Sequence, residues 1–340
     1  MAVTIRDLAR ELNLSITTVS RAIDGYGDVA EGTRARILRA AQERGYTPNR
    51  AARQLRTQRA DSLGYILPGS PQQFTDPFFS EFVAGLGDAL AGSGFDLLVS
   101  SAPHGEAAER ELYARWINAH KVDGFVLNRL RLRDWRVQFL SERHFPFVTL
   151  ERTQDPYEYL CVTVDGKSGV RRVVRALAES GRRRIAYIGG LPELVIHNER
   201  YQGYLLGMAD ALLSPDERLV LQADLTREGG YRATLELLGR PEPPDAVVCV
   251  NDLTAIGVLR AARERGIPVG KALAVTGFDG IEEAAHSLPP LTTLSQPVYA
   301  VSQSMVRLLM PLITGETVEQ SCLSIEPELI LRESTAPLSV

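Results

Sequence analysis

Apolar positions near the start of the chain recur with the spacing of three short helices. The first stripe, at i, i+3, i+4 and i+7, consists of Ile5, Leu8, Ala9 and Leu12. The second helix follows the turn "LNLS", and its inward stripe consists of Val19, Ala22 and Ile23. A third helix is predicted from about Thr33 to Arg44, with Gly45 placed to end it. Three short helices with a tight first turn predict a helix-turn-helix.

From about residue 61 the pattern changes to short apolar strands that alternate with helical segments. The predicted strands are Leu63–Leu67, Phe95–Ser100, Gly124–Leu127, Phe147–Leu150, Arg184–Gly189, Ala246–Val250 and Leu273–Gly277. The predicted helices between them are Phe79–Ala91, Glu106–Ala119, Lys167–Glu179, Arg200–Leu213, Gly230–Leu238 and Leu253–Glu264. Strands joined by crossover helices predict parallel sheets that are covered on both faces.

These patterns divide the chain into three predicted parts. Residues 1–47 form an all-α helix-turn-helix head, residues 48–60 form a hinge helix or linker, and residues 61–340 form a two-lobed α/β body. The strand–helix alternation runs twice, which places lobe 1 at about 61–160 and lobe 2 at about 162–288. The tail returns to both lobes, with 292–322 assigned to lobe 1 and 325–340 to lobe 2.

The charge is distributed unevenly between these parts. The net charge of −4 combines +5 in residues 1–60 with −9 in the remainder. A basic head on an acidic body indicates that the head meets a polyanion, although chance surface charge is an equally good explanation of this feature alone.

The second helix presents polar side chains opposite its apolar stripe. Thr17 and Arg21 point outward and can reach base edges in a major groove, and the hydroxyls of Thr18 and Ser20 flank them. The alternative is a small bundle with a solvated polar face. The segment "YTPNRAARQLRTQRA" then supplies arginines for phosphates and Leu55, which could wedge between base pairs from the minor groove. A basic linker is the alternative for this segment.

Polar residues follow the predicted strands of the body. They include Asp76, Glu151, Asp165, Asn251, Asp252 and Asp279, with Arg200 predicted to open a helix. Open parallel sheets bind ligands outside the carboxyl ends of their strands. Carboxylates, amides and one arginine suit a neutral polyhydroxylated ligand, although an ordinary loop cap is the simpler explanation of each residue taken alone.

The head resembles the DNA-binding head and hinge helix of the lactose/galactose repressor (LacI/GalR) family, through "TIRDLARELNLSITTVSRAIDG" and "TPNRAARQLRT". The resemblance implies that Ile16, Thr17 and Arg21 read the major groove. It also implies that Ala52 and Leu55 enter the minor groove of a palindromic operator. The implied phosphate contacts are Thr4, Ser15, Thr18, Ser20 and Asn49. Asp24 stands where Asn is usual and would repel a phosphate, and Ala30 stands where Ser often begins the third helix.

The body is similar to the effector-binding domain of the same family, a two-lobed fold like that of periplasmic binding proteins. The matching segments are "IGGLPELVIHNERYQGY", "VCVNDLTAIGVLRAARERGI" and "LAVTGFDGIEEAAHSLPPLTTLSQP". The resemblance implies that Arg200, Asn251 and Asp279 hold a small-molecule effector. It implies that Glu151 and the loop residues Asp76, Phe78 and Phe79 close over it, and that His197 varies with the ligand.

Departures from the family pattern bear on the effector. Leu225 stands where an aromatic residue often stacks on it, which favours a sugar over a planar purine. The resemblance implies a homodimer on double-stranded operator DNA, most simply a repressor. An activator or dual regulator, and a repressor that responds to a purine or another metabolite, remain as alternatives.

Several other classes find no support in the sequence. No phosphate-binding GxxxxGK[ST], no GxGxxG after a strand and no GxSxG occurs, so no catalytic residue and no cofactor is expected. The five histidines lack metal-ligand spacing. No apolar run approaches ~20 residues and the charged N-terminus does not resemble a signal peptide, so we expect a cytoplasmic protein without membrane contact. Three widely spaced cysteines indicate reduced thiols and not a disulfide framework.

Overall fold

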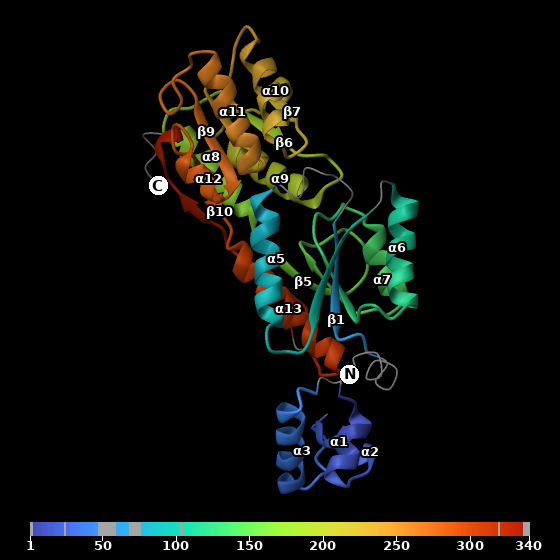
Figure 1. The fold of residues 1–340 in the computed structure, drawn as a ribbon. Coiled ribbons are helices and arrows are strands. Elements are labelled where there is room, and N and C mark those ends of the chain that lie inside the picture. The colour runs from blue at the N-terminus through green and yellow to red at the C-terminus, as the bar shows by residue number, and fades with distance from the viewer. Residues whose placement is uncertain are drawn as a thin grey trace. The chain divides into compact units, whose positions relative to one another are not determined.

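The computed structural model describes residues 3–23, 25–46, 59–67, 76–102, 105–318 and 320–335. The chain divides into two compact units, residues 1–60 and 61–340. Figure 1 shows a purely helical first unit and a second unit of mixed helices and strands.

The first unit contains α1 (Ile5–Leu12), α2 (Ile16–Ile23) and α3 (Glu31–Glu43). Thr4 caps α1 in a reciprocal arrangement, because its hydroxyl accepts from the Asp7 N–H while the Asp7 carboxylate accepts from the Thr4 N–H. The helix α3 begins at Glu31, two residues before the predicted start. Ala30 precedes it without a side-chain cap, so the usual polar signal for the start is missing. The small core includes Leu8, Val19 and Ile37, each completely buried.

The second unit holds two six-stranded sheets with the same strand order. The first sheet has the order β11-β5-β4-β3-β1-β2 and is parallel throughout. Its strands are β1 (Ser62–Leu67), β2 (Asp96–Ser101), β3 (Gly124–Leu127), β4 (Phe147–Leu150), β5 (Leu160–Val164) and β11 (Cys322–Ile325). Apart from the edge strands β2 and β11, these strands are buried almost along their whole length, as expected for parallel strands covered on both faces.

The second sheet has the order β12-β10-β9-β8-β6-β7 and differs in one respect, because its edge strand β12 is antiparallel to β10. Its strands are β6 (Ile185–Gly189), β7 (Val220–Gln222), β8 (Ala246–Cys249), β9 (Ala274–Asp279), β10 (Thr292–Ser295) and β12 (Glu328–Ile330). The short 3-10 helices η2 (Glu217–Leu219) and η3 (Glu333–Thr335) lie beside this sheet. We call the layers built on the first and second sheets lobe 1 and lobe 2.

Helices pack in pairs on the sheets (Figure 1). In lobe 1, α5 (Pro77–Leu90) packs against α13 (Val298–Thr314), while α6 (Glu106–Asn118) and α7 (Trp135–Glu142) lie on the opposite face. In lobe 2, α8 (Gly166–Glu179) packs against α9 (Val195–Asp210), and α10 (Arg227–Leu238) packs against α11 (Asp252–Glu264). The short helix α12 (Glu282–His286) follows β9.

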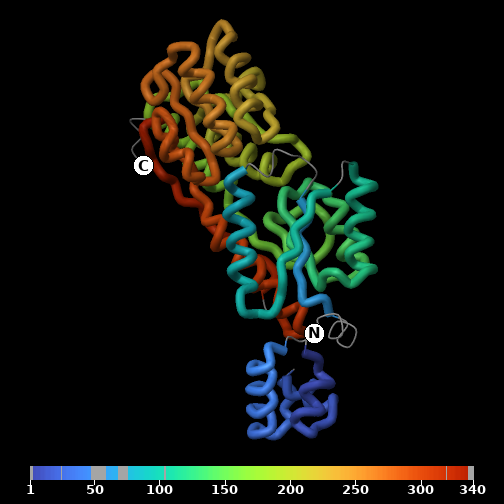
Figure 2. The backbone as a smooth tube through the Cα atoms, in the orientation of Figure 1, coloured from blue at the N-terminus to red at the C-terminus, as the bar shows by residue number. Residues whose placement is uncertain are grey.

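Three crossings of the chain join the lobes, and they correct the predicted lobe boundaries. The prediction ended lobe 1 at about 160 and returned 292–322 to it. Instead β5 belongs to the first sheet, and β10 pairs in parallel with β9 in the second. The chain crosses after β5, after β10 and between β11 and β12, and the last crossing is visible along the red end of the tube in Figure 2. The pairing partner of each strand, which the sequence pattern does not reveal, decides its lobe.

One helix of the body was not predicted, and another differs from its prediction. The segment Trp135–Glu142 forms α7, although its residues face buried surroundings along most of their length and give no clear amphipathic stripe. The helix predicted at Arg200–Leu213 begins five residues earlier, at Val195. Leu194 precedes it without a side-chain cap, so the prediction that Arg200 opens this helix is wrong.

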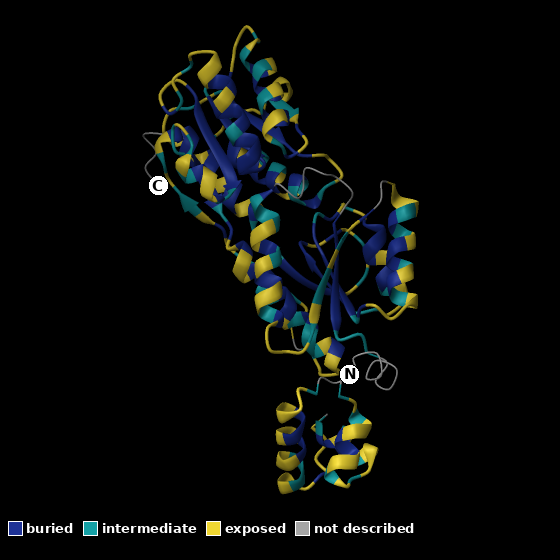
Figure 3. Ribbon diagram, viewed as in Figure 1, coloured by how far each residue is buried: buried dark blue, intermediate teal, exposed yellow. Residues whose placement is uncertain are grey.

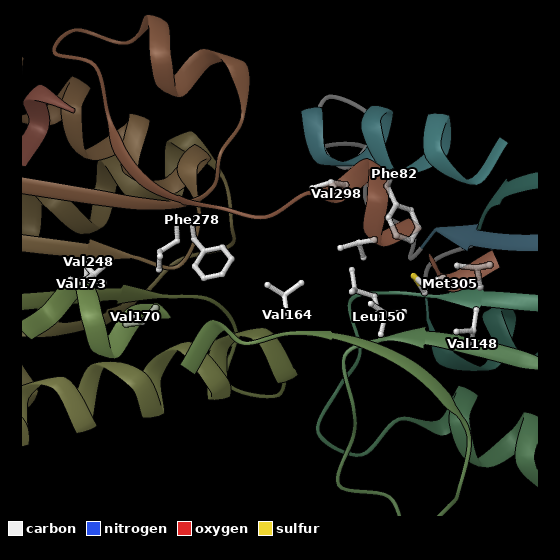
Figure 4. Close-up of a cluster of buried hydrophobic side chains, with 14 of the residues drawn as sticks. Phe82, Val148, Leu150, Val164, Val170, Val173, Val248, Phe278, Val298 and Met305 are labelled. Atoms are coloured by element: carbon white, nitrogen blue, oxygen red, sulfur yellow. The ribbon is translucent and has the colours of Figure 1, made fainter. Parts of the chain in front are cut away.

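One large apolar core runs through both lobes. Figure 3 shows the strands of the body buried and the helices exposed along one side. In Figure 4, Val164 at the end of β5 lies between Phe278 and Val173 of lobe 2 and Leu150 and Met305 of lobe 1. The lobes are therefore joined by packed side chains as well as by the crossing segments.

Two cysteines are paired, contrary to the expectation of free thiols. Cys161 of β5 and Cys322 of β11 are register partners on adjacent strands, and their Cα atoms lie 4.5 Å apart with the sulfurs bonded. Their sequence separation of 161 hides this proximity in the sequence. Cys249 is free and buried. Among the described residues, the search for a helix long and apolar enough to cross a membrane finds none.

Candidate nucleic-acid interface and ligand pocket

The outward face of α2 carries the side chains predicted to meet bases. Ile16, Thr17 and Arg21 are exposed, and Ile16 retains 46% of its surface. The opposite face is anchored, because Val19 and Ala22 are buried against the other two helices. The helix is thereby held by one face while the other stays open to a partner.

The hydroxyls predicted to meet phosphates have structural partners as well. The Ser15 hydroxyl accepts from the Thr18 N–H at 3.0 Å and lies 2.8 Å from the Thr18 hydroxyl, so Ser15 caps α2. Thr4 caps α1, and Ser20 is half-buried. Each hydroxyl of the caps can still accept or donate one further bond. The remaining predicted DNA contacts, Asn49, Ala52 and Leu55, and the departure at Asp24, lie outside the described residues.

A pocket lies between the lobes at the carboxyl ends of their strands. It contains about 500 Å³ of free space, open solvent at its mouth included. It is lined by Asp76, Phe78, Asn128, Arg129, Leu150, Glu151, Ile196, Arg200, Leu225, Asn251, Asp279 and Gln296.

Glu151 follows β4 and turns back into the pocket. Its backbone is left-handed, with φ +75°, and its Oε1 accepts from the Val164 N–H at 3.2 Å. Burial raises the pKa of the Glu151 carboxyl to about 7, while the Val164 N–H and the charge of Arg200 oppose the shift. Near neutral pH the group therefore exists both as a hydrogen-bond donor and as an acceptor.

Arg200 and Asp279 face each other from lobe 2. The Arg200 Nη2 lies 3.7 Å from the Asp279 Oδ1, and the guanidinium carbon lies 3.5 Å from the centroid of the Phe278 ring. A second guanidinium nitrogen donates to the Val250 carbonyl. The Gln296 amide donates to the Asp279 Oδ1 at 2.7 Å. Burial raises the pKa of Asp279 well above its usual range although Arg200 favours the charged form.

Lobe 1 contributes a second ion pair to the pocket. The Arg129 Nη2 lies 2.7 Å from the Asp76 Oδ2, and the other carboxylate oxygen of Asp76 accepts from the Phe78 N–H at the start of α5. Asp76 is therefore both the N-cap of α5 and a pocket residue. Such a double role is common for polar residues at strand and helix ends, because caps and ligands need the same acceptors.

Six of the eight residues predicted to meet the effector line this pocket: Asp76, Phe78, Glu151, Arg200, Asn251 and Asp279. The structure brings these six together, while their role toward an effector stays a prediction. Phe79 and His197 are not among the lining residues. Phe79 stacks on Tyr65 in the core of lobe 1, with ring centroids 6.1 Å apart. His197 stacks on Tyr201 at 5.7 Å and packs against Gly189, where any side chain would clash with the imidazole.

Several lining residues were not predicted from the sequence. Asn128 and Arg129 follow β3, and Gln296 follows β10, so they are polar residues at strand ends like the predicted ones. The hydrophobic members Leu150 and Ile196 give no comparable signal, whereas Leu225 was singled out by its position in the family pattern. Conversely, Asp165 caps α8 and Asp252 accepts from the Gly280 and Ile281 N–H groups, so both of these strand-end residues stabilise the backbone.

A backbone bridge joins the lobes beside the pocket. Arg131 and Leu194 form an antiparallel bridge, with the Leu132 N–H donating to the Glu193 carbonyl at 2.7 Å and the Val195 N–H donating to the Leu130 carbonyl at 2.9 Å. The bridge connects the loop that carries Asn128 and Arg129 to the start of α9, which carries Arg200. A ligand that changes the spacing of the lobes must therefore act on these bonds.

The pocket chemistry suits the binding of hydroxyl groups. Its polar groups are carboxyls, amides and guanidinium groups. Each polar group can donate to or accept from a ligand hydroxyl. The apolar side chains Phe78, Leu150 and Ile196 supply the remaining wall.

Comparison with known proteins agrees with this reading of both units. Residues 4–49 match the family described as "Bacterial regulatory proteins, lacI family", and residues 174–335 match a periplasmic binding protein-like domain. The HTH-type transcriptional regulator CelR of Thermobifida fusca is 37% identical over 322 residues, which cover 93% of this chain and 94% of CelR.

Solved structures extend the similarity to the fold. A transcriptional regulator CelR–cellobiose complex aligns with a TM-score of 0.76 and 34% identity, over 98% of this chain and 99% of that one. The lac repressor dimer bound to operator and the anti-inducer ONPF aligns with a TM-score of 0.85 and 25% identity, over 98% and 99% of the two chains. The expected helical head and two-lobed α/β body are confirmed. The chain belongs to the LacI family and is a DNA-binding transcriptional regulator, not an enzyme.

Proposed function

We propose that this regulator is a repressor that binds a palindromic operator as a homodimer and is switched by a small sugar. The pocket carries this proposal, because hydrogen-bond acceptors and donors from both lobes converge on it. In this proposal residues 1–47 bind DNA, and residues 61–340 bind the effector and a second copy of the chain. Residues 48–60 connect these two parts.

The sugar class follows from the type and spacing of the polar groups. Adjacent sugar hydroxyls can each donate to a carboxylate and accept from an amide or guanidinium, as at Asp279, Gln296 and Arg200. Leu225 is buried at the wall and offers no ring on which a purine could stack. The similar regulator CelR, whose structure holds cellobiose, supports a mono- or disaccharide.

On DNA, α2 is proposed to lie in the major groove. Ile16, Thr17 and Arg21 would contact base edges, while Thr4, Ser15, Thr18 and Ser20 would hold phosphates. The operator-bound lac repressor dimer, to which this chain is similar, supports operator binding as a dimer. The proposed contacts of Asn49, Ala52 and Leu55 complete the surface.

The switch is proposed to work through the spacing of the lobes. A sugar that contacts Glu151 of lobe 1 and Arg200 of lobe 2 favours one spacing, and the bridge at Arg131 and Leu194 responds to it. Coupling between two such sites is typically about 1–3 kcal/mol, a change of about 5- to 150-fold in operator affinity.

A thermal-shift screen of the full chain tests the effector class. Mono- and disaccharides, with cellobiose among them, are compared with purine bases and nucleosides. A ligand at a hundredfold excess over Kd adds about 2.7 kcal/mol to the free energy of unfolding, so a sugar should raise the melting temperature visibly. A purine that raises it instead would overturn the sugar assignment. Operator selection from random duplexes, followed by titration of the sugar, then decides whether the ligand releases or strengthens DNA binding.

A further inference from the structure

The recognition helix presents Arg21 together with an acidic neighbour from the following loop. The Arg21 Nη2 lies 2.7 Å from the Asp28 Oδ2, and both side chains keep about half of their surface, 44% and 50%. The Arg21 guanidinium carbon also lies 5.2 Å from the centroid of the Tyr26 ring. Asp28 therefore belongs to the same exposed surface as the arginine.

The loop that carries Asp28 is fixed from several directions. The Tyr26 N–H donates to the Arg21 carbonyl at 3.0 Å, and the guanidinium of Arg34 in α3 donates to the Tyr26 carbonyl. Val29, next to Asp28, is buried in the core of the head. Asp28 thus meets Arg21 from a defined position, and the ion pair does not depend on a freely moving loop.

We propose that Asp28 is a specificity-determining residue of the DNA-binding surface, which stays paired with Arg21 on the operator and fixes the guanidinium against the base edge. This inference rests on the proposed function, in which α2 faces DNA. Arg21 has five N–H donors, and its closest contact to Asp28 is made by Nη2. Donors therefore remain for the two acceptors of a guanine.

The alternative is that Arg21 leaves Asp28 when it meets DNA. An exposed ion pair is worth only about 0.2–1 kcal/mol, so its loss alone would be small. The carboxylate, however, would then be left without its partner inside an interface crowded with phosphates, which is costly for a desolvated charge. Retaining the pair avoids that cost. Asp28 and Tyr26 also hold the Arg21 side chain in place before DNA binds. Less rotamer entropy is therefore lost when Arg21 contacts a base.

The two arrangements predict opposite changes in specificity when the carboxylate is removed. If Asp28 orients Arg21, Asp28→Ala discriminates less between bases at one base pair of the operator. Its affinity for random DNA rises at the same time, because a negative charge has been removed from the surface. If Asp28 only competes with DNA for Arg21, the affinity of the same variant for the operator rises at least as much as its affinity for random DNA.

The test uses the full chain, an operator selected from random duplexes, its single base-pair variants and a random duplex of equal length. Arg21→Ala first identifies the base pair that this arginine reads. We expect Asp28→Ala and Asp28→Asn to lower the ratio of operator to random-DNA affinity about fivefold or more, with the loss at that base pair. Glu43→Gln, which removes an exposed charge at the end of α3, is the matched control and should leave base preference unchanged.

Three results would overturn the inference. If Asp28→Ala raises the affinities for operator and random DNA equally, as Glu43→Gln does, Asp28 acts only as a surface charge. If Asp28→Ala raises the affinity for the operator more than that for random DNA, Asp28 competes with the DNA for Arg21. If Arg21→Ala changes no base preference, the placement of α2 on the bases fails along with the inference. In a double-mutant cycle, Arg21→Ala should erase the effect of Asp28→Ala on base preference, because the two residues act as one unit.

Discussion

In lobe 1, Asn128 follows β3 and Glu151 follows β4, and in lobe 2, Asn251 follows β8 and Asp279 ends β9. These strands occupy equivalent places in the two sheets, because both sheets share one strand order. Both carboxyl residues have positive φ, +75° for Glu151 and +123° for Asp279. Each lobe therefore contributes one amide and one carboxyl to the pocket from equivalent strand ends.

The repeated pairs differ in how their charge is compensated. Asp279 faces the Arg200 guanidinium and the Gln296 amide, whereas the contact of Glu151 is a single backbone N–H, that of Val164. The asparagines differ too, because Asn251 caps α11 while Asn128 donates to the Tyr65 hydroxyl at 2.6 Å. Equivalent positions thus have different surroundings: the carboxyl of lobe 2 has a cation and an amide beside it, whereas that of lobe 1 accepts from a backbone N–H, and burial raises the pKa of both.

The largest expected effect comes from breaking the compensation in lobe 2. Arg200→Ala leaves the buried Asp279 without its cation and removes the bond to the Val250 carbonyl. Breaking a buried charge pair by removing one partner lowers the free energy of unfolding by about 3–5 kcal/mol. Sugar affinity measured by calorimetry should also fall at least about tenfold, because a hydrogen bond to a charged group contributes about 1.5–3 kcal/mol. Operator affinity without sugar should stay unchanged, because Arg200 lies in the body.

Two matched variants sharpen this prediction. Arg129→Ala breaks the pair of lobe 1, where the arginine is 23% exposed, and should cost sugar affinity less than Arg200→Ala. Arg171→Ala breaks an exposed pair with Asp210, in which the arginine keeps 46% of its surface, and should leave sugar affinity unchanged. If operator binding by Arg200→Ala still responds fully to the sugar, Arg200 is not part of the sugar site.

The two lobes also show how much of the fold and of the pocket can be predicted from the sequence. Residues after apolar strands were found by pattern alone, because a parallel sheet exposes its carboxyl ends at one edge. The pairing of β10 with β9 was missed, since strand partners depend on contacts between distant segments. The same reason explains the unforeseen Cys161–Cys322 pair.

Orientation of side chains was harder to predict than their position along the chain. Phe78 and Phe79 are neighbours at the start of α5, and one reaches the pocket while the other stacks on Tyr65. The early start of α9 places His197 against Gly189 instead of in the pocket. When a helix begins a few residues earlier than predicted, the side chains of those residues take helical directions. A start without a capping side chain, such as that after Leu194, cannot be recognised from the local sequence.

The next effect in size concerns the carboxyl of lobe 1 and pH. The pKa of Glu151 rises from 4.5 to about 7 in the folded chain, so between these values the folded state binds more protons than the unfolded state. The free energy of unfolding should therefore fall as pH rises through this window, by about 3 kcal/mol in total. Glu151→Gln, which keeps the shape without titrating, should lose this part of the pH dependence.

Urea unfolding at pH 5 and pH 8 measures this difference through tryptophan fluorescence. Both tryptophans, Trp116 and Trp135, lie in the body, so the signal reports the unit that contains Glu151. Asp279 titrates in both proteins, and the comparison of wild type with Glu151→Gln cancels its contribution. Parallel pH profiles for the two proteins would show that Glu151 keeps an ordinary pKa.

The smallest effect separates the two asparagines. The Asn251 Oδ1 accepts from the Thr254 N–H at 3.0 Å, and its amide donates to the Leu225 carbonyl at 3.2 Å. Serine is an equally good cap, so Asn251→Ser should preserve the free energy of unfolding while weakening sugar binding, whereas Asn251→Ala should also destabilise the body by about 1 kcal/mol. Asn128→Ser, which caps no helix, should give no such advantage over Asn128→Ala. If serine and alanine at 251 destabilise equally, the cap is not what Asn251 contributes, and its equivalence to Asn128 is closer than the structure indicates.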